Sequence, residues 1–385
     1  MKGSVHTFSF PTRIHFGPGA RLRIAEDLRA QGRKRPLVVT DRGLAALPVF
    51  AEVLTSLSSL EAMPFSGVAG NPVASQVSAG VQAFRAHDAD SIVGIGGGAA
   101  LDVAKAVALM ARHPGELFEY EDGLADARPV DQPVPYWVAV PTTAGTGSEV
   151  GRSAVISDDR TKVKKVIFAP QLLARAVFAD PEVTVGLPRP VTAATGMDAL
   201  THCIEAYLAK AYHPICDGIA LEGLRLGARA LPRCVETPGD VEARGSMMMS
   251  SMMGAIAFQK GLGVVHSCAH ALSAVADLHH GLANGLMIEP ALRFNLQAVP
   301  DRFRILAQTV GVDGDGEAFL RWLAELKQRI GIPRGPAEAG VRPAEVGRLT
   351  ELAFADTCHL NNPRPCTPED FRRLWDEAFA AARTA

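Results

Sequence analysis

The 385-residue sequence lacks several features that mark particular classes of protein. Its formal net charge is only −2, with 39 basic and 41 acidic residues, which argues against a basic face for nucleic acid. Aromatic residues make up only 6%, so the core has to be built mainly from aliphatic side chains and methionine. Hydrophobic residues at 48% and charged residues at 21% are ordinary values for a globular protein, which excludes a mainly disordered chain.

Long apolar runs and cysteine pairs are also absent. No uninterrupted apolar window reaches the length of about 18 residues that a membrane span requires. The first residues, MKGSVHTFSFPTRIHFGPG, contain no apolar stretch typical of a secretory signal. The six cysteines form no CxxC pair, as expected for reduced thiols. We therefore expect a cytoplasmic protein without a membrane partner.

The pattern along the chain predicts two domains. Short apolar runs alternate with helical spacing in the first half: PLVVTD (36–41), SIVGIGGG (91–98) and YWVAVPTTAGTGSE (136–149). Such alternation predicts a parallel sheet with helices on both faces. After the proline-marked stretch at 181–190, the windows are almost all helical. We therefore predict an α/β domain over residues 1–185 and an all-helical domain over residues 186–385.

A glycine-rich turn follows the second of these runs, in GIGGGAALDVAK (94–105). Gly97 and Gly98 remove side chains where a strand becomes a helix, so backbone N–H groups can approach an anion at the helix N-terminus. Asp102 falls in the first turn, where it either serves a ligand or complements the helix dipole. The glycine spacing alone is a weak match to a dinucleotide fingerprint, and a tight turn without a ligand is the alternative.

The loop PTTAGTGSE (141–149) follows the next strand and is also built from small residues. It offers four hydroxyl groups, on Thr142, Thr143, Thr146 and Ser148. Two such loops predict a shared crevice at the carboxyl ends of the strands, where open α/β sheets bind ligands. Asp41 ends an earlier strand, where a carboxylate can bind a ribose hydroxyl and repel a 2′-phosphate, which favours NAD over NADP. The alternative for Asp41 is a simple turn residue.

Metal-ligand residues recur at helical spacing in two windows of the second half. Asp198 and His202 are four apart in TGMDALTHCIEAY (195–207), and His266 and His270 are four apart in GVVHSCAHALSAVADLHHG (263–281). Residues four apart share one helix face. A carboxylate and several imidazoles on neighbouring helices suit a first-row transition metal, whereas the alternative is a set of hydrogen-bonded core histidines.

Two adjacent histidines, His279 and His280, end the second window directly before Gly281. We take this glycine as the end of the helix. Spacing alone does not choose between the two histidines as a metal ligand.

Together these segments resemble the iron-containing (group III) alcohol dehydrogenase family. The resemblance covers essentially the whole chain from about residue 16. It rests on GGGAALDVAK, PTTAGTGSEV, DPEVTVGLP, TGMDALTHCIEAY, FQKGLGVVHSCAHALSA, HHGLANGLMIEPALRFN and NNPRP. It implies a dehydroquinate synthase-like fold, in which a dinucleotide-binding α/β domain and an all-helical domain enclose the active site.

The resemblance also implies roles for particular residues. Fe²⁺, with Zn²⁺ as the alternative, would be bound by Asp198, His202, His266 and His280. His270 would lie near nicotinamide and substrate as the catalytic histidine. NAD(H), favoured over NADP(H), would be contacted by Asp41, Gly97, Gly98, Asp102, Thr142, Thr143, Thr146, Ser148 and Lys164. The chain departs from the family at Ala99, where serine is usual, and at Ala271 and Ser273 after His270.

The implied activity is hydride transfer between nicotinamide and a small alcohol or aldehyde, in a homodimer or higher homo-oligomer. One alternative is a reductase of an acidic carbonyl compound, of the maleylacetate, hydroxybutyrate, sulfoacetaldehyde or phosphonoacetaldehyde type. The cations Lys164, Lys260 and Arg364 either face such a substrate or lie on the solvated surface. The other alternative is a non-catalytic relative that binds NAD or metal.

Overall fold

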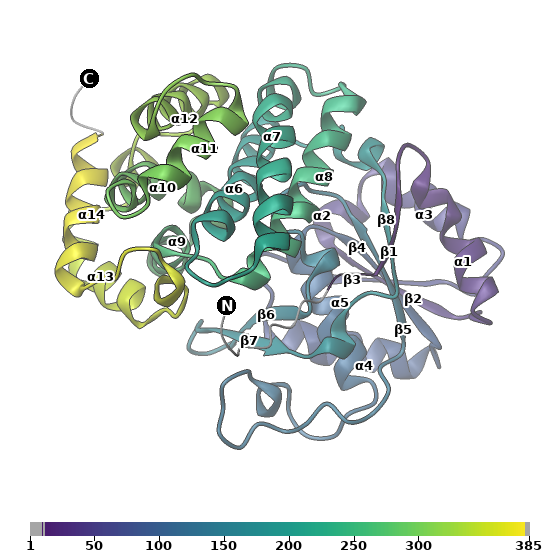
Figure 1. The fold of residues 1–385 in the computed structure, drawn as a ribbon. Helices are drawn as coiled ribbons and strands as arrows, with labels where there is room; N and C mark the ends of the chain where they lie inside the picture. The colour runs from purple at the N-terminus through teal and green to yellow at the C-terminus, as the bar shows by residue number, and fades with distance from the viewer. Residues whose placement is uncertain (1–9, 11, 382–385) are drawn as a thin grey trace, which may run out of the picture.

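The computed structural model describes residue 10 and residues 12–381, and its first half is built on a parallel sheet (Figure 1). Six strands pair in the order β1-β8-β5-β4-β2-β3, all parallel to their neighbours. Their bounds are β1 Arg13–Phe16, β2 Pro36–Asp41, β3 Met63–Val68, β4 Ser91–Gly96, β5 Tyr136–Pro141 and β8 Ala176–Ala179. β6 (Ser153–Ser157) and β7 (Lys164–Phe168) form a separate antiparallel pair.

Helices cover both faces of this sheet, as the alternating pattern predicts. One face packs on α4 (Ala74–Ala86) and α5 (Gly98–Met110), and the other packs on α1 (Ile24–Ala30) and α3 (Pro48–Ser56). β4 is buried along its whole length, because neighbouring strands and both helical layers enclose it. The three runs recognised in the sequence are confirmed as β2, β4 and β5. The four-residue strands β1 and β8, and the six-residue strand β3, were not among them.

The second half of the chain is helical throughout its described residues. Its α-helices are α6 Arg189–Leu208, α7 Pro214–Glu236, α8 Val241–Ala257, α9 Val264–Ala276, α10 His280–Leu296, α11 Pro300–Val310, α12 Gly316–Ile330, α13 Val346–Ala355 and α14 Pro368–Ala381. The short α2 (Arg42–Ala45) belongs to the first half. The predicted fold class, an α/β region followed by an all-helical one, is therefore confirmed.

Helix α8 joins the two halves. Its side chains Met248, Met252 and Ala255 pack into the core of the sheet region, while Met247 and Ala257 belong to the core of the helical region. The predicted division at 185/186 lies between the 3-10 turn η5 (Pro181–Thr184) and α6, and it stays a prediction. Among the described residues, the helices are too short or too polar to cross a lipid bilayer.

Candidate active site

The two small-residue loops meet at the carboxyl ends of β2, β4 and β5. A Cβ atom on Gly98 would lie 2.8 Å from Thr146 Oγ1, and one on Gly97 would lie 3.4 Å from Thr143. A Cβ atom on Gly96 would come within 3.3 Å of Asp41 Oδ2. Glycine is therefore required at Gly98 by the close approach of Thr146. The structure brings together, at one edge of the sheet, Asp41, the turn at residues 96–98 (the glycine turn) and the loop at residues 141–149 (the threonine loop).

The predicted cofactor residues Asp102 and Ser148 lie behind these loops and bond to each other. Ser148 Oγ donates to Asp102 Oδ1 at 2.6 Å, and the Val155 backbone N–H donates to Oδ2 at 3.0 Å. The buried Lys105 ammonium donates to Ser148 Oγ and to the Ser153 carbonyl oxygen, both at 2.7 Å. This network ties α5 to the threonine loop and to β6, so it holds the loops in place.

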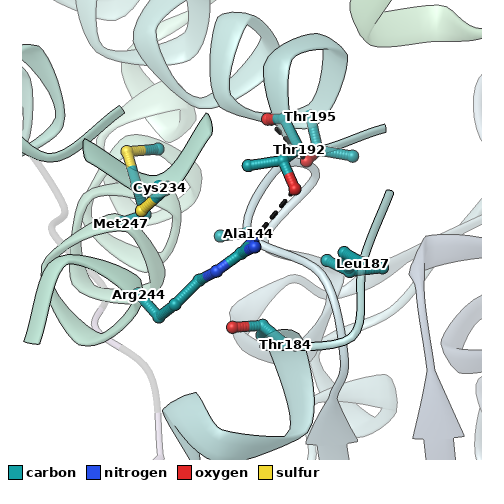
Figure 2. A pocket seen from close by; sticks show the side chains of 8 residues that line it. All are labelled: Ala144, Thr184, Leu187, Thr192, Thr195, Cys234, Arg244 and Met247. Atoms are coloured by element: carbon teal, nitrogen blue, oxygen red, sulfur yellow. Dashed lines mark hydrogen bonds between the residues drawn. The ribbon is translucent and has the colours of Figure 1, made fainter. Parts of the chain in front are cut away.

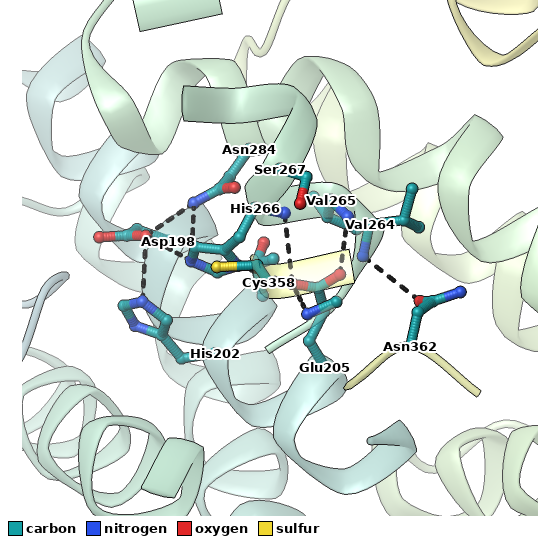
Figure 3. A network of polar contacts seen from close by, with 12 residues as sticks. Asp198, His202, Glu205, Val264, Val265, His266, Ser267, Asn284, Cys358 and Asn362 are labelled. Atoms are coloured by element: carbon teal, nitrogen blue, oxygen red, sulfur yellow. Dashed lines mark hydrogen bonds and ion pairs between the residues drawn. The ribbon is translucent and has the colours of Figure 1, made fainter. Parts of the chain in front are cut away.

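Four ligand-type side chains from α6, α9 and α10 converge on one point. Figure 3 shows three of them, Asp198, His202 and His266. The Nε2 atoms of His202, His266 and His280 lie 3.6, 3.9 and 3.5 Å from Asp198 Oδ1. All four donor atoms lie within 4.8 Å of one another. The structure thus brings together the four residues expected to be metal ligands, and it selects His280 over His279 as the histidine beside Asp198.

Two further side chains orient this cluster. His266 Nδ1 is 2.6 Å from Glu205 Oε2, so this ring presents Nε2 to the centre. Glu205 also accepts backbone N–H groups from Gly263, Val265 and His266 at the start of α9. The Asn284 amide donates to Asp198 Oδ1 at 2.8 Å and faces Nε2 of His266 and His280. Such outer contacts fix the tautomer and direction of metal-binding imidazoles.

Burial sets the charge of these groups. It lowers the pKa of His266 and of His280 well below the usual histidine value, so both rings are neutral and offer a lone pair. Burial alone would raise the pKa of Asp198, but the surrounding imidazoles and the Asn284 amide outweigh it and hold the pKa below its usual value. A buried, ionised carboxylate beside neutral imidazoles calls for a cation.

The donor set fits a divalent first-row metal. Three imidazole nitrogens and one carboxylate oxygen suit iron or zinc. Ligand atoms about 2.1 Å from a tetrahedral metal lie roughly 3.4 Å from one another. The separations of 3.5 to 3.9 Å from Asp198 Oδ1 are close to this value.

Gly281 was expected to end a helix, and that prediction is wrong. Helix α9 ends at Ala276, Asp277 adopts a left-handed conformation, and α10 begins at His280. Gly281 therefore lies in the first turn of a new helix. A Cβ atom there would be 2.1 Å from the Ala194 carbonyl oxygen of α6, so glycine lets α10 approach α6 closely enough for His280 to reach Asp198.

His270, the expected catalytic residue, lies beside the four-residue cluster and is more exposed. Its ring stacks on that of His280 with centroids 5.2 Å apart, and 36% of its side chain is exposed. His270 Nδ1 is 2.7 Å from Asp356 Oδ2. Asp356 also accepts from Ser267 Oγ and from the Cys358 backbone N–H. Within the described part of the chain, Nε2 of His270 is thus the ring nitrogen without a hydrogen-bond partner.

The three cations considered for an acidic substrate have different surroundings. Lys260 is buried and bonds to the Tyr207 carbonyl oxygen and Asp217, so it is neither in the cleft nor on the solvated surface. Arg364 lies over the Phe294 ring and donates to the Phe294 carbonyl oxygen. Lys164, at the start of β7, forms no ion pair with a described residue. Burial lowers its pKa, and Asp277 and Asp102 oppose that shift.

Sequence reasoning missed the residues that support the site. Glu205 follows His202 by three positions and Asn284 follows His280 by four, so helical spacing could have identified both. Asp356 lies 86 positions from its partner His270, and no local pattern links the two.

Comparison with known proteins places these features in one family. Residues 11–181 match the sequence model described as iron-containing alcohol dehydrogenase. Residues 192–379 match the one described as Fe-containing alcohol dehydrogenase family, C-terminal. The two matches together span nearly the entire described chain, on either side of the predicted division.

Individual relatives match over their full lengths. A 4-hydroxybutyrate dehydrogenase from Cupriavidus necator is 38% identical, over 96% of this chain and 98% of that protein. An NAD-dependent methanol dehydrogenase from Bacillus methanolicus is 35% identical, over 97% and 99%. A solved 1,3-propanediol oxidoreductase superposes with a TM-score of 0.93 at 35% identity, over 97% and 100%. The chain therefore belongs to the iron-containing alcohol dehydrogenase family and is an oxidoreductase.

Proposed function

We propose that this protein is a metal-dependent, NAD-linked alcohol dehydrogenase or aldehyde reductase that acts on a small alcohol or aldehyde. The observation that carries the proposal is the convergence of Asp198, His202, His266 and His280 within 4.8 Å, beside the two loops at the sheet edge. We propose Fe²⁺ as the metal that these four residues hold, with Zn²⁺ as the alternative. When bound, the metal supplies Lewis-acid stabilisation of negative charge on the substrate oxygen.

The sheet edge would bind the cofactor. Backbone N–H groups of Gly97 and Gly98, at the N-terminus of α5, face the position suited to a diphosphate. Asp41 Oδ1 accepts the Leu44 N–H, which leaves Oδ2 for a ribose hydroxyl. Thr142, Thr143 and Thr146 line the same edge. NAD carries the hydride chemistry, and the protein orients it.

His270 would transfer the proton. Its Nδ1–H is held by Asp356 at 2.7 Å, so Nε2 is free to accept the alcohol proton, directly or through water, and to return it in the reverse direction. His270→Ala should lower kcat by about 10²- to 10⁴-fold, the usual contribution of general acid–base catalysis, while metal content stays unchanged. Unchanged kcat in this variant would remove His270 from the mechanism.

The decisive experiment combines metal analysis of the purified protein with NADH and NADPH oxidation assays. The carbonyl panel should include simple, hydroxylated, carboxylated, sulfonated and phosphonated aldehydes. We expect stoichiometric metal and metal-dependent NADH oxidation. Full turnover by metal-free protein, or no turnover with any carbonyl compound, would contradict the proposal.

A second candidate, reduction of an acidic carbonyl compound, is favoured by one observation. Lys164 is a largely buried cation without an ion-pair partner among the described residues. Its positive charge is one of the causes that lower the pKa of His280. Lys164→Met separates two roles for this residue. A raised KM for carboxylated aldehydes alone would indicate substrate recognition, whereas a raised KM for NADH alone would indicate the cofactor contact expected from the sequence.

We also expect a homodimer or higher homo-oligomer and no nucleic-acid partner. Light scattering coupled to size exclusion would measure the oligomeric state directly.

A further inference from the structure

A small cavity lies beside Ala144 of the threonine loop, where α6, α7 and α8 meet η5 (Figure 2). It is lined by Ala144 of the loop, Thr184 of η5, Thr192 and Thr195 of α6, Cys234 of α7 and Arg244 of α8. The space open to the centre of a water molecule is about 10 Å³. This is the room that one water molecule or one monatomic ion needs, and it is too small for a phosphate group.

The Arg244 guanidinium is buried in this region without a counter-ion. The residue is 3% exposed, and no described carboxylate lies within 4.0 Å of its nitrogens. Two acidic residues lie at the start of α8, Asp240 and Glu242, and both pair with Arg233. Arg244 Nε donates to the Pro238 carbonyl oxygen and Nη1 donates to Thr192 Oγ1, each at 3.0 Å. Nη2 is buried and has no hydrogen-bond partner among the residues that the structure describes.

A guanidinium remains charged even where burial lowers its pKa, as it does here. An unpaired buried charge is strongly destabilising, so the charge of Arg244 requires compensation. The thiol of Cys234 does not supply it, because burial raises the pKa of that thiol to about 11 and keeps it neutral.

The hydroxyl groups around the cavity are arranged as donors or are already used. Thr195 Oγ1 donates to the Val191 carbonyl oxygen at 2.9 Å, and Thr184 Oγ1 donates to the Pro181 carbonyl oxygen at 2.8 Å. Thr192 Oγ1 accepts from Arg244, so its own proton is free to bond elsewhere. The protons left free for a ligand at the cavity are those of Nη2 and of the Thr192 hydroxyl group.

We propose that this cavity is a binding site for a single monatomic anion of the chloride class, held by Arg244 and Thr192. The anion neutralises the buried guanidinium, and it joins α6 and α8 behind the loop that contains Ala144. Water would satisfy the free donors but would not neutralise the charge, which is why an anion is favoured. The inference concerns a site outside the catalytic centre and does not depend on the proposed activity.

Bromide provides the direct test on the unmodified protein. Crystals grown with bromide as the halide should show an anomalous difference peak in the cavity, within hydrogen-bond distance of Arg244 Nη2. The peak should persist when NADH is soaked in. A cavity with ordinary water density and no anomalous signal would overturn the proposal, as would loss of the peak with NADH.

Thermal unfolding gives an independent measurement. At constant ionic strength, replacing gluconate with chloride or bromide should raise the Tm of the wild-type protein by a few degrees, because the anion binds only the folded state. Arg244→Met should abolish this halide-dependent rise, and Thr192→Val, which keeps the shape and removes the hydroxyl, should reduce it. Arg225→Met removes an exposed arginine of α7 and should leave it intact. An equal response in wild type and Arg244→Met would overturn the proposal.

Discussion

The two sides of the candidate active site use buried polar groups in opposite ways; we call the side formed by α6, α9 and α10 the helical wall and the side formed by the loops at the sheet edge the sheet wall. On the helical wall, Asp198 and three imidazoles point their lone pairs at one another, and little within the chain satisfies them except the Asn284 amide. On the sheet wall, both carboxylate oxygens of Asp102 accept hydrogen bonds from the chain itself. The first wall is built to be completed by a cation. In the second, the chain itself satisfies the carboxylate, and this network links α5 to the threonine loop and to β6.

The strongest test of this difference is His266→Ala. We expect the variant to lose its metal and to lose turnover by at least about 10³-fold, because one of four converging donors disappears. Metal stoichiometry and kcat measure the two effects separately. His279→Ala is the matched control, because the adjacent histidine lies outside the cluster and its side chain forms no capping hydrogen bond at the start of α10. Metal loss in the control, or full metal in His266→Ala, would contradict the assignment.

The orienting carboxylate of the helical wall gives the next effect. The two carboxylate oxygens of Glu205 accept from the His266 ring and from three backbone N–H groups. Glu205→Gln keeps the shape of the side chain but replaces one of these acceptor oxygens with an NH₂ group, which is a donor. We expect metal affinity to fall by about 10- to 100-fold, the usual cost of losing an outer-shell partner.

Competition with a chelator measures this loss of affinity. Glu289→Gln is the control, because Glu289 of α10 pairs with Lys327 and is not part of the four-residue cluster. An affinity equal to wild type in Glu205→Gln would show that Glu205 serves only the start of α9.

Many of the residues in both walls could be predicted from the sequence, and those that could not were missed for a physical reason. The i,i+4 spacing on one helix placed Asp198 beside His202, because helical geometry is local. Gly281 was misassigned, because glycine also occurs where two helices touch, and only the packing against Ala194 shows this. The surroundings of Asp356 and Arg244 are formed by segments that meet only in the folded chain. No spacing rule therefore predicts that Asp356 pairs with His270 or that Arg244 has no counter-ion among the described residues.

The sheet wall is tested by Asp41→Gly. Removing this carboxylate should raise the ratio of kcat/KM for NADPH to that for NADH by about tenfold or more, because like charge no longer opposes a 2′-phosphate. Asp41 also caps α2 by accepting the Leu44 N–H, so loss of the cap could disturb the loop. Asp41→Ser keeps a capping oxygen without the charge and should show the same change in preference. An unchanged ratio in both variants would remove Asp41 from the cofactor site.

The smallest expected effect concerns Glu149, which is buried in the sheet wall at the end of the threonine loop. Burial raises its pKa to about 7, although Lys105 opposes the shift. Between the unfolded value near 4.5 and this folded value, the folded state binds more protons, so the contribution of Glu149 to stability falls as pH rises through that window. Glu149→Gln should therefore match the wild-type Tm near pH 4.5 and exceed it by a few degrees at pH 8.

The control is Glu26→Gln, at an exposed position, which should show no such divergence from the wild-type Tm. A Tm difference between Glu149→Gln and wild type that does not change with pH would show that folding leaves the pKa of Glu149 at its ordinary value, so that the folded protein carries this carboxylate ionised above about pH 4.5. The sheet wall would then hold a permanent buried charge and would resemble the helical wall more closely than its hydrogen bonds indicate.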